Sequence, residues 1–208
     1  MIILEEDDEF KIPDYDTEIG NVKALVEFCR KEIRSNRIQA IPHFNAILNR
    51  ELDAVVDILS IGHFHAAARS ARTALELVIT NLYRHFYPGG RLEDISFQAK
   101  YGVRRLSDRK RSPILQLVRD GILWEDEFLM FREWYKTLSG YVHYRITYEL
   151  CHTLPKRIKN EQYYAEVARL AEEEGGVAKV VKATLIKYSL EPALETLHIL
   201  LKSYRRIR

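Results

Sequence analysis

Residues 63–86, HFHAAARSARTALELVITNLYRHF, decide the fold of this chain. Their apolar residues recur three or four positions apart, which is the period of an α-helix that buries one face. The stripe consists of Phe64, Ala68, Ala71, Leu75, Val78, Leu82 and Phe86. Because the sequence Pro88-Gly89-Gly90 follows, the helix is expected to end there.

The same period predicts helices on both sides of this segment. Upstream there are two stripes: Ile19, Val22, Val26, Cys29 and Ile33, with Asp16 or Thr17 as the cap, and Phe44, Leu48, Leu52, Val55 and Leu59, closed by Gly62. Downstream, a short helix is expected over 114–118. A long helix is expected from near Trp124, with the stripe Trp124, Phe128, Phe131, Tyr135, Leu138 and Val142.

Three more helices are predicted near 160–173, 177–188 and 190–206. In the last one Pro192 suits the first turn and Ser189 the cap, and the stripe is Leu190, Leu194, Leu197, Leu201 and Tyr204. No segment sustains the alternation of a strand, so the sequence predicts an all-α bundle of antiparallel helices. It divides into an acidic tail, 1–16, and one helical domain, 17–208.

Composition narrows the class of protein. The chain has 208 residues, 47% of them hydrophobic and 30% charged, which suffices for one core. Its net charge is only +2, but residues 1–18 hold eight acids and one base, so the remainder is basic. Global charge therefore gives no strong nucleic-acid signal, although it is compatible with a polarised surface.

The sequence shows neither a membrane span nor a signal peptide. Cys29 and Cys151 are the only cysteines and form no CxxC pair. We therefore expect a cytoplasmic protein with reduced thiols, no metal and no cofactor. Few Gln and Asn beside many Lys, Arg and Glu also indicate a thermophile.

A band of polar residues flanks the apolar stripe on each of the two long central helices. At 100° per residue, one band holds His65, Arg69, Arg72 and Glu76, and the other holds Arg132, Lys136, Ser139 and His143. If the two helices face each other in antiparallel orientation, both bands border the same groove. Such a set of side chains suits an anion or phosphodiester site.

A structural explanation of the bands stays open. Polar residues flank the apolar stripe at any solvated bundle edge, and Arg72 with Glu76 can form a simple i,i+4 ion pair. The bands therefore name a candidate site without establishing an activity.

These residues resemble the HEPN superfamily of helical bundles. The segment from Gly62 to Ala68, continued by Arg72-Thr73-Ala74-Leu75-Glu76, is similar to that family's glycine-ended helix followed by a small-residue helix with an Arg-x-x-Leu-Glu-like core. Leu138-Ser139-Gly140-Tyr141-Val142-His143 is similar to its Leu-Ser-x-x-x-His stretch. The resemblance covers roughly residues 42–150 and implies an HEPN-like core, which additional C-terminal helices extend.

Many members of that family are dimeric, metal-independent ribonucleases of defence or toxin systems. The resemblance makes His143 the general acid/base position. The family's Arg, four to six residues before the His, has no match by position, because Lys136 lies seven and Arg132 eleven residues before His143. Lys136, Arg132 or Arg72 would have to replace it in space.

Two hypotheses follow from different classes of protein. The first is a nucleic-acid-binding protein and, where catalytic, a degenerate endoribonuclease in which His143 acts on the RNA and Arg72, Arg132 and Lys136 hold the phosphate. The second is a non-catalytic dimeric interaction or scaffold protein, in which His143 is a hydrogen-bonding residue at the edge of the core.

Three weaker signals lie outside the bands. His63 and His65 form an HxH, but side chains two positions apart on a helix diverge by about 200°, so they share a metal only outside a helix. The basic run 100–111 offers Arg104, Arg105 and Arg109 as RNA contacts, or forms a solvated face or a partner for the acidic tail. The terminal basic residues Lys202, Arg205, Arg206 and Arg208 complement a helix C-terminus or contact a ligand.

Homodimerisation is also predicted. Five alanines make one end of the central helix slim: Ala66, Ala67, Ala68, Ala71 and Ala74. Small residues let a second helix approach closely, and this helix comes either from the same chain or from another copy. The resemblance implies dimers as well.

Overall fold

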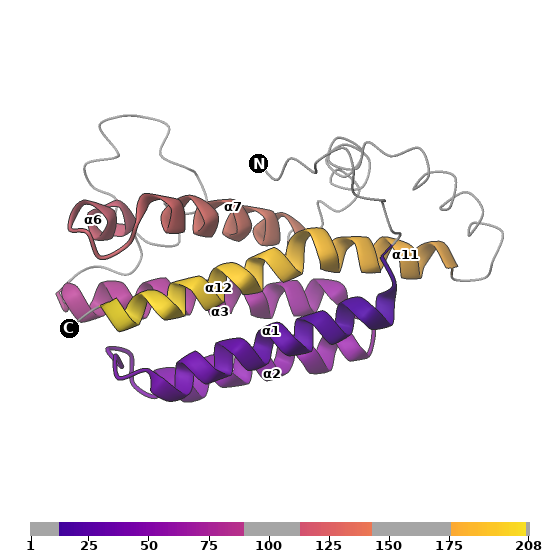
Figure 1. Cartoon of the computed structure of the whole chain (residues 1–208), viewed down its shortest axis with the longest axis horizontal. Coiled ribbons are helices and arrows are strands. Elements are labelled where there is room, and N and C mark those ends of the chain that lie inside the picture. The colour runs from indigo at the N-terminus through magenta and orange to yellow at the C-terminus, as the bar shows by residue number, and fades with distance from the viewer. Residues whose placement is uncertain (1–12, 90–112, 143–175, 207–208) are drawn as a thin grey trace.

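A computed structural model shows a bundle of helices. The structure describes residues 13–89, 113–142 and 176–206. Within these ranges every regular element is a helix, which confirms the all-α prediction for the described residues. Figure 1 shows the long helices lying side by side along the long axis of the molecule.

The helices are, in chain order, α1 (Tyr15–Ser35), α2 (Phe44–Ser60), α3 (Phe64–Phe86), α6 (Pro113–Arg119), α7 (Glu125–Val142), α11 (Gly176–Leu185), the π-helical turn η2 (Ile186–Leu190), α12 (Glu191–Ser203) and the 3-10 turn η3 (Tyr204–Arg206). Helix α3 packs against α2, α7 and α12, and α1 packs against α2 and α12. The two segments with the polar bands, α3 and α7, are therefore neighbours.

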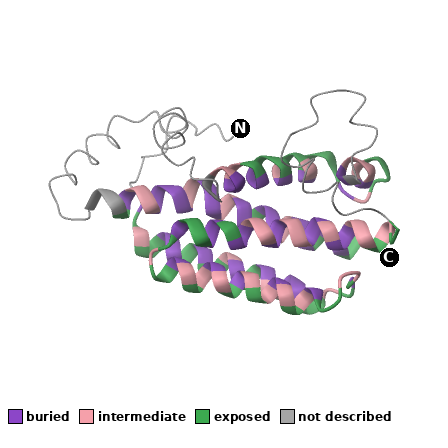
Figure 2. Cartoon of the chain, turned by 180° about the vertical axis from the view of Figure 1, so that it is seen from behind, coloured by how far each residue is buried: buried purple, intermediate pink, exposed green. Residues whose placement is uncertain are grey.

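The predicted apolar stripes form the core. Every stripe residue of α1, α2 and α12 is buried, and so are those of α3 from Phe64 to Leu82, with Phe86 half-buried. Figure 2 shows the buried residues on the faces that the helices turn toward one another. Burying a large aliphatic side chain stabilises the fold by about 1.5–3 kcal/mol, so these stripes dominate the packing energy.

The stripe of α7 is buried only in part. Phe131, Tyr135 and Leu138 are buried, whereas Phe128 is half-buried and Trp124 is 60% exposed. The helix begins at Glu125, so Trp124 precedes its first turn and does not follow the helical register. Its ring lies under the guanidinium of Arg206, with Cζ 3.8 Å from the ring centroid.

Two predicted helix caps are wrong. Helix α1 is capped by Asp14, whose carboxylate accepts hydrogen bonds from the N–H and the hydroxyl of Thr17, each at 2.9 Å. The helix consequently begins two residues before the predicted start of the domain at residue 17.

Ser189 is not at a helix cap, because the two predicted C-terminal segments form one helical run through η2. Pro192, in the first turn of α12 as predicted, has no N–H for an i→i−4 bond. The π-helical turn before it accommodates this loss, since the N–H of Glu191 donates to the carbonyl of Ile186 five residues back.

The slim face of α3 is used within the chain. Ala67, Ala68, Ala71 and Ala74 are buried under neighbouring helices of the same chain, and Ala66 is exposed. The small residues therefore explain the close packing of α3 in one copy, and the homodimer stays a prediction that rests on the resemblance. Among the described helices, none has the length and apolarity needed to cross a bilayer.

Two carboxyl groups meet where α1 packs against α12. Glu18 is buried, and the side-chain amide of Asn21 donates to Glu18 Oε2 at 2.9 Å and to Glu191 Oε1 at 3.5 Å. Burial of Glu191, its hydrogen bond with Glu18 and the charge of Glu18 raise the pKa of Glu191 to about 8, opposed by Asn21 and by the charge of Lys187. Glu191 is therefore mostly protonated at neutral pH.

This pair makes the stability of the bundle depend on pH. A carboxyl group whose pKa rises on folding contributes stability that is complete below its unfolded pKa of 4.5 and is lost as pH rises through about 8. Between pH 5 and pH 9 we expect the wild type to lose about 1–2 kcal/mol more than Glu191→Gln, a value discounted for partial exposure. Urea unfolding followed by circular dichroism measures both.

The matched control is Glu195→Gln, because Glu195 is exposed on the same helix. This variant should lose as much stability with rising pH as the wild type does. Parallel pH curves for the wild type and Glu191→Gln would contradict the prediction.

Candidate functional site

The contact between α3 and α7 is built around the guanidinium of Arg72. Its Nη2 lies 3.8 Å from Glu76 Oε2, and its Cζ lies 5.4 Å from the centroid of the Tyr135 ring on α7. The hydroxyl of Tyr135 donates to the same Glu76 oxygen at 3.3 Å. The three side chains therefore form one cluster across the two helices, and the cation–π contact and the carboxylate orient the guanidinium.

Arg72 keeps hydrogen-bonding capacity in this cluster. The 3.8 Å separation from Glu76 is an ion pair but is too long for a hydrogen bond. Within the part of the chain that the structure describes, the buried Nε of Arg72 has no hydrogen-bond partner. An unpaired buried donor costs about 1–3 kcal/mol, and because Nε is buried, a ligand acceptor pairs with it only if the Arg72 side chain shifts.

Exposed cations flank the Arg72 cluster on both helices. Arg69 lies one turn before Arg72 on α3, and Arg132 and Lys136 lie on α7 beside Tyr135. All three side chains are exposed. The acidic residues Glu125, Asp126 and Glu127 occupy the first turn of α7, so its basic residues lie further along the helix. The arrangement suits recognition of an anion that extends beyond one phosphate.

The other two described band residues have different surroundings. Ser139 is buried, and its hydroxyl donates to the carbonyl of Tyr135 at 2.7 Å, so its own helix satisfies it. His65 is exposed in the first turn of α3, and its ring forms a T-shaped pair with that of Phe64, with the centroids 6.0 Å apart. The structure thus brings Arg69, Arg72, Arg132 and Lys136 to one pair of helices and places Ser139 in the core.

Four predicted site residues lie outside the described residues. They are His143, Arg104, Arg105 and Arg109. Conversely, sequence reasoning assigned Tyr135 only to the apolar stripe and missed its contact with Arg72. An amphipathic tyrosine at the edge of a stripe, next to a polar band, was the available signal.

Metal and thiol chemistry find no support among the described residues. No group of three or more His, Cys, Asp or Glu side chains there is arranged to hold a metal ion. Burial raises the pKa of the Cys29 thiol to about 12, and its sulfur lies 3.7 Å from the carbonyl of Leu194. Cys29 is therefore a core residue and an inert thiol.

Comparison of the chain with protein-family models, with curated proteins and with solved structures finds no match. The site must consequently be interpreted from its own geometry.

Proposed function

We propose that this protein binds RNA through the surface formed by α3 and α7, and that it is a degenerate, metal-independent ribonuclease. The observation that carries the proposal is the Arg72 guanidinium, which Tyr135 and Glu76 orient and whose Nε has no partner among the described residues. Arg69, Arg132 and Lys136 extend the positive surface on both sides. Phosphate recognition needs such a combination of an oriented fork and surrounding charge.

The proposal includes an antiparallel, HEPN-like core and His143 as the acid/base group. In this scheme Arg72, Arg132 and Lys136 stabilise the charge that develops on the phosphate, and no metal takes part. A homodimer would bring a second set of these residues to the RNA.

A specific observation also favours a second candidate function, a non-catalytic interaction protein. Arg72 already has a carboxylate and an aromatic ring as partners, and Ser139 is satisfied by the backbone. In that function the cluster only holds α7 on α3, and the exposed cations bind an acidic protein partner.

Binding to labelled single-stranded RNA tests the first proposal. We expect Arg69→Gln/Lys136→Gln to weaken binding about tenfold at low salt and to lower the slope of log affinity against log salt by about 1.4, because each lost phosphate contact contributes about 0.7 for single strands. Fluorescence anisotropy between 50 and 200 mM salt gives both values. The control is Arg34→Gln/Arg50→Gln, which removes two cations that are 72% and 77% exposed on α1 and α2. If both double variants lose the same RNA affinity, the loss comes from the change in net charge and not from the α3–α7 surface.

Cleavage is measured separately, with EDTA present. The wild type should cleave RNA, and His143→Ala should abolish cleavage while binding remains within about twofold. Binding without cleavage in the wild type would leave RNA recognition in place and remove the ribonuclease. The absence of both would favour the interaction protein.

A further inference from the structure

A second surface with the chemistry of a nucleic-acid contact lies on the other side of the bundle, where α1 packs against α12. Phe28 of α1 is 52% exposed, and its ring stacks on the imidazole of His198, with the centroids 5.8 Å apart and the planes inclined by 21°. A half-exposed phenylalanine stacked on a histidine offers an open aromatic face. Such a face beside cations is how proteins stack unpaired bases.

The cations on this surface come from both helices. Lys202 lies one turn after His198 on α12, and Arg205 follows three residues later in η3. Lys31 lies one turn after Phe28 on α1. Lys31 and Lys202 are exposed, and the Arg205 side chain is 57% exposed. The charges of Lys202 and Arg205 are therefore separated by about one helical turn along the axis of the C-terminal helical run.

A buried carboxylate fixes the position of Arg205. Glu32 is only 6% exposed, and its Oε2 lies 2.6 Å from Arg205 Nη2. The same Nη2 also donates to the hydroxyl of Ser35 at 3.4 Å, so both contacts hold one end of the guanidinium. Holding a guanidinium in this way reduces the entropy lost when it binds a phosphate.

Glu32 also faces His198, whose Nε2 lies 3.7 Å from Glu32 Oε1. Burial of the imidazole and the charge of Lys202 lower the pKa of His198, against the opposing effect of Glu32, with Arg205 lowering it further. His198 is therefore mostly neutral at pH 7, so its ring stacks as an uncharged aromatic group.

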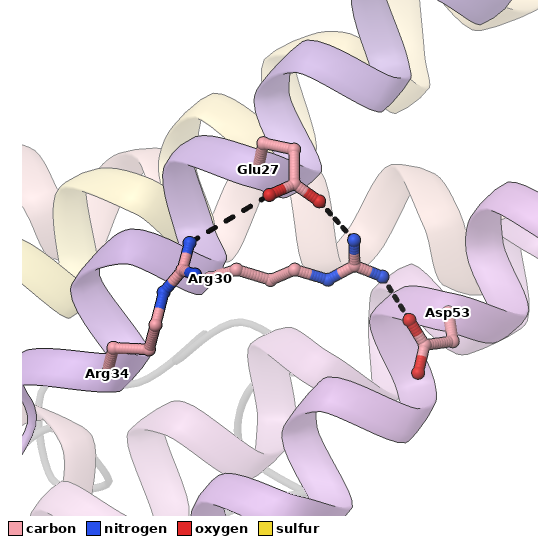
Figure 3. A network of polar contacts seen from close by, with 4 residues as sticks. All are labelled: Glu27, Arg30, Arg34 and Asp53. Atoms are coloured by element: carbon pink, nitrogen blue, oxygen red, sulfur yellow. Dashed lines mark hydrogen bonds and ion pairs between the residues drawn. The ribbon is translucent and has the colours of Figure 1, made fainter.

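The opposite flank of α1 differs. Figure 3 shows Arg30 and Arg34 held by Glu27, with Arg30 reaching across to Asp53 of α2. On that flank the positive charges are matched by carboxylates. Lys31 and Lys202 have no ion pair within the part of the chain that the structure describes, so the available charge is on the α12 side.

We propose that Phe28, Lys31, His198, Lys202 and Arg205 form a binding surface for single-stranded nucleic acid, with one unpaired base stacked on Phe28 and neighbouring phosphates on the cations. The proposal extends the RNA binding proposed above to a second face of the molecule, and it rests on that function. An acidic peptide would use the cations but would not need the open aromatic ring.

The test compares two variants of this surface by fluorescence anisotropy with a labelled single-stranded RNA of twelve nucleotides. Phe28→Ala should weaken binding about five- to tenfold, because stacking on one open ring face contributes at the low end of the range for a base. Lys31→Gln/Lys202→Gln should weaken it by a similar factor and lower the salt slope by about 1.4. Phe28→Ala should leave binding of a double-stranded RNA within twofold. Thermal melting confirms that both variants are folded.

The control is again Arg34→Gln/Arg50→Gln, which makes the same change of net charge on the opposite flank of α1 and on α2 and should change affinity by less than twofold. The results separate the two proposals. Loss of binding only in Arg69→Gln/Lys136→Gln supports the α3–α7 site and overturns this inference. Loss only in the Phe28 and Lys31/Lys202 variants supports this inference and overturns the α3–α7 site. If polyglutamate displaces the RNA equally well from the wild type and from Phe28→Ala, the surface binds anions in general, and the inference of base stacking on Phe28 is overturned as well.

Discussion

Asn81→Ala should lower the free energy of unfolding by about 3 kcal/mol, the largest effect we expect from a single polar substitution in this protein. Asn81 is completely buried on α3. Its Oδ1 accepts from the N–H of Ile41 at 3.0 Å, and its Nδ2 donates to the carbonyl of Ile38 at 2.9 Å. Alanine would leave the N–H of Ile41 without its partner, which costs about 1–3 kcal/mol, and would leave the carbonyl of Ile38 with only the amide of Asn36, at 3.0 Å, as its donor.

The same side chain connects three parts of the chain. Its Nδ2 also lies 3.4 Å from the hydroxyl of Tyr204 in η3, and that hydroxyl donates to the carbonyl of Val78. Three segments therefore meet at one amide: the connection between α1 and α2, the C-terminal half of α3 and the turn η3. We expect the loss at Asn81 to appear as a loss of cooperative stability of the whole bundle.

Urea unfolding of the variant measures this loss. Asn49→Ala is the matched control, because Asn49 is a half-buried asparagine on α2 and should cost less than about 1 kcal/mol. A loss below about 1 kcal/mol for Asn81→Ala would mean that water or a shifted backbone replaces its hydrogen bonds, and it would contradict the role given to this residue.

The helices and their buried faces could be predicted because one-dimensional periodicity determines them. Ile19, Val22 and Val26 lie on one side of any helix, whatever that side packs against. Helix ends were equally local: Gly62, where a helix was expected to close, and Gly121, which follows the short helix expected over 114–118, adopt positive φ values of 84° and 68°, which favour glycine.

Caps and exceptions to helical geometry were harder to predict. Asp14, Asp16 and Thr17 are all capping residue types within four positions, and only the observed hydrogen bonds select Asp14. A serine three residues before a proline is typical of a helix start, which is why a new helix was predicted at Ser189–Pro192. The π-helical turn that continues the helix there leaves no signal in the amino-acid composition. Boundaries of this kind depend on which backbone groups neighbouring helices leave unpaired.

The candidate site was predictable to the extent that it follows helical faces. The bands containing Arg72 and Lys136 were recognisable, and α3 and α7 are indeed neighbours. The cluster of Arg72, Glu76 and Tyr135 was not predictable, since it depends on the rotation of each helix about its axis. The α1–α12 surface was even harder to predict, because Phe28 and His198 are 170 residues apart in the sequence.

Buried ion pairs between distant parts of the chain are equally hard to predict from the sequence. Glu127 looks like an ordinary acidic residue in the first turn of a helix, yet it is only 3% exposed. Arg206 Nη2 donates to both of its oxygens, at 2.7 and 2.6 Å, and the N–H of Trp124 donates to Oε2 at 2.9 Å. The partners are 79 residues apart, so periodicity gives no indication of this pair.

Arg206→Ala should lower the free energy of unfolding by about 2 kcal/mol. Removing one partner of a buried ion pair costs about 3–5 kcal/mol, and we discount this range because the Arg206 side chain is 35% exposed. The variant should also shift the emission of Trp124 to longer wavelength, because the guanidinium 3.8 Å from its ring centroid covers one face of the ring, while the residue as a whole is 60% exposed. Trp134 is buried and should not contribute to the change.

Two controls distinguish the Arg206–Glu127 ion pair from a general effect of charge near the C-terminus. Lys202→Ala removes an exposed cation from α12 and should change neither stability by more than about 0.5 kcal/mol nor the emission. Arg206→Ala/Glu127→Gln should recover part of the lost stability, because most of the cost arises from the unpaired carboxylate rather than from the missing guanidinium. If the double variant is as unstable as the sum of both single variants, Arg206 acts through its packing on Trp124, and the ion pair contributes little.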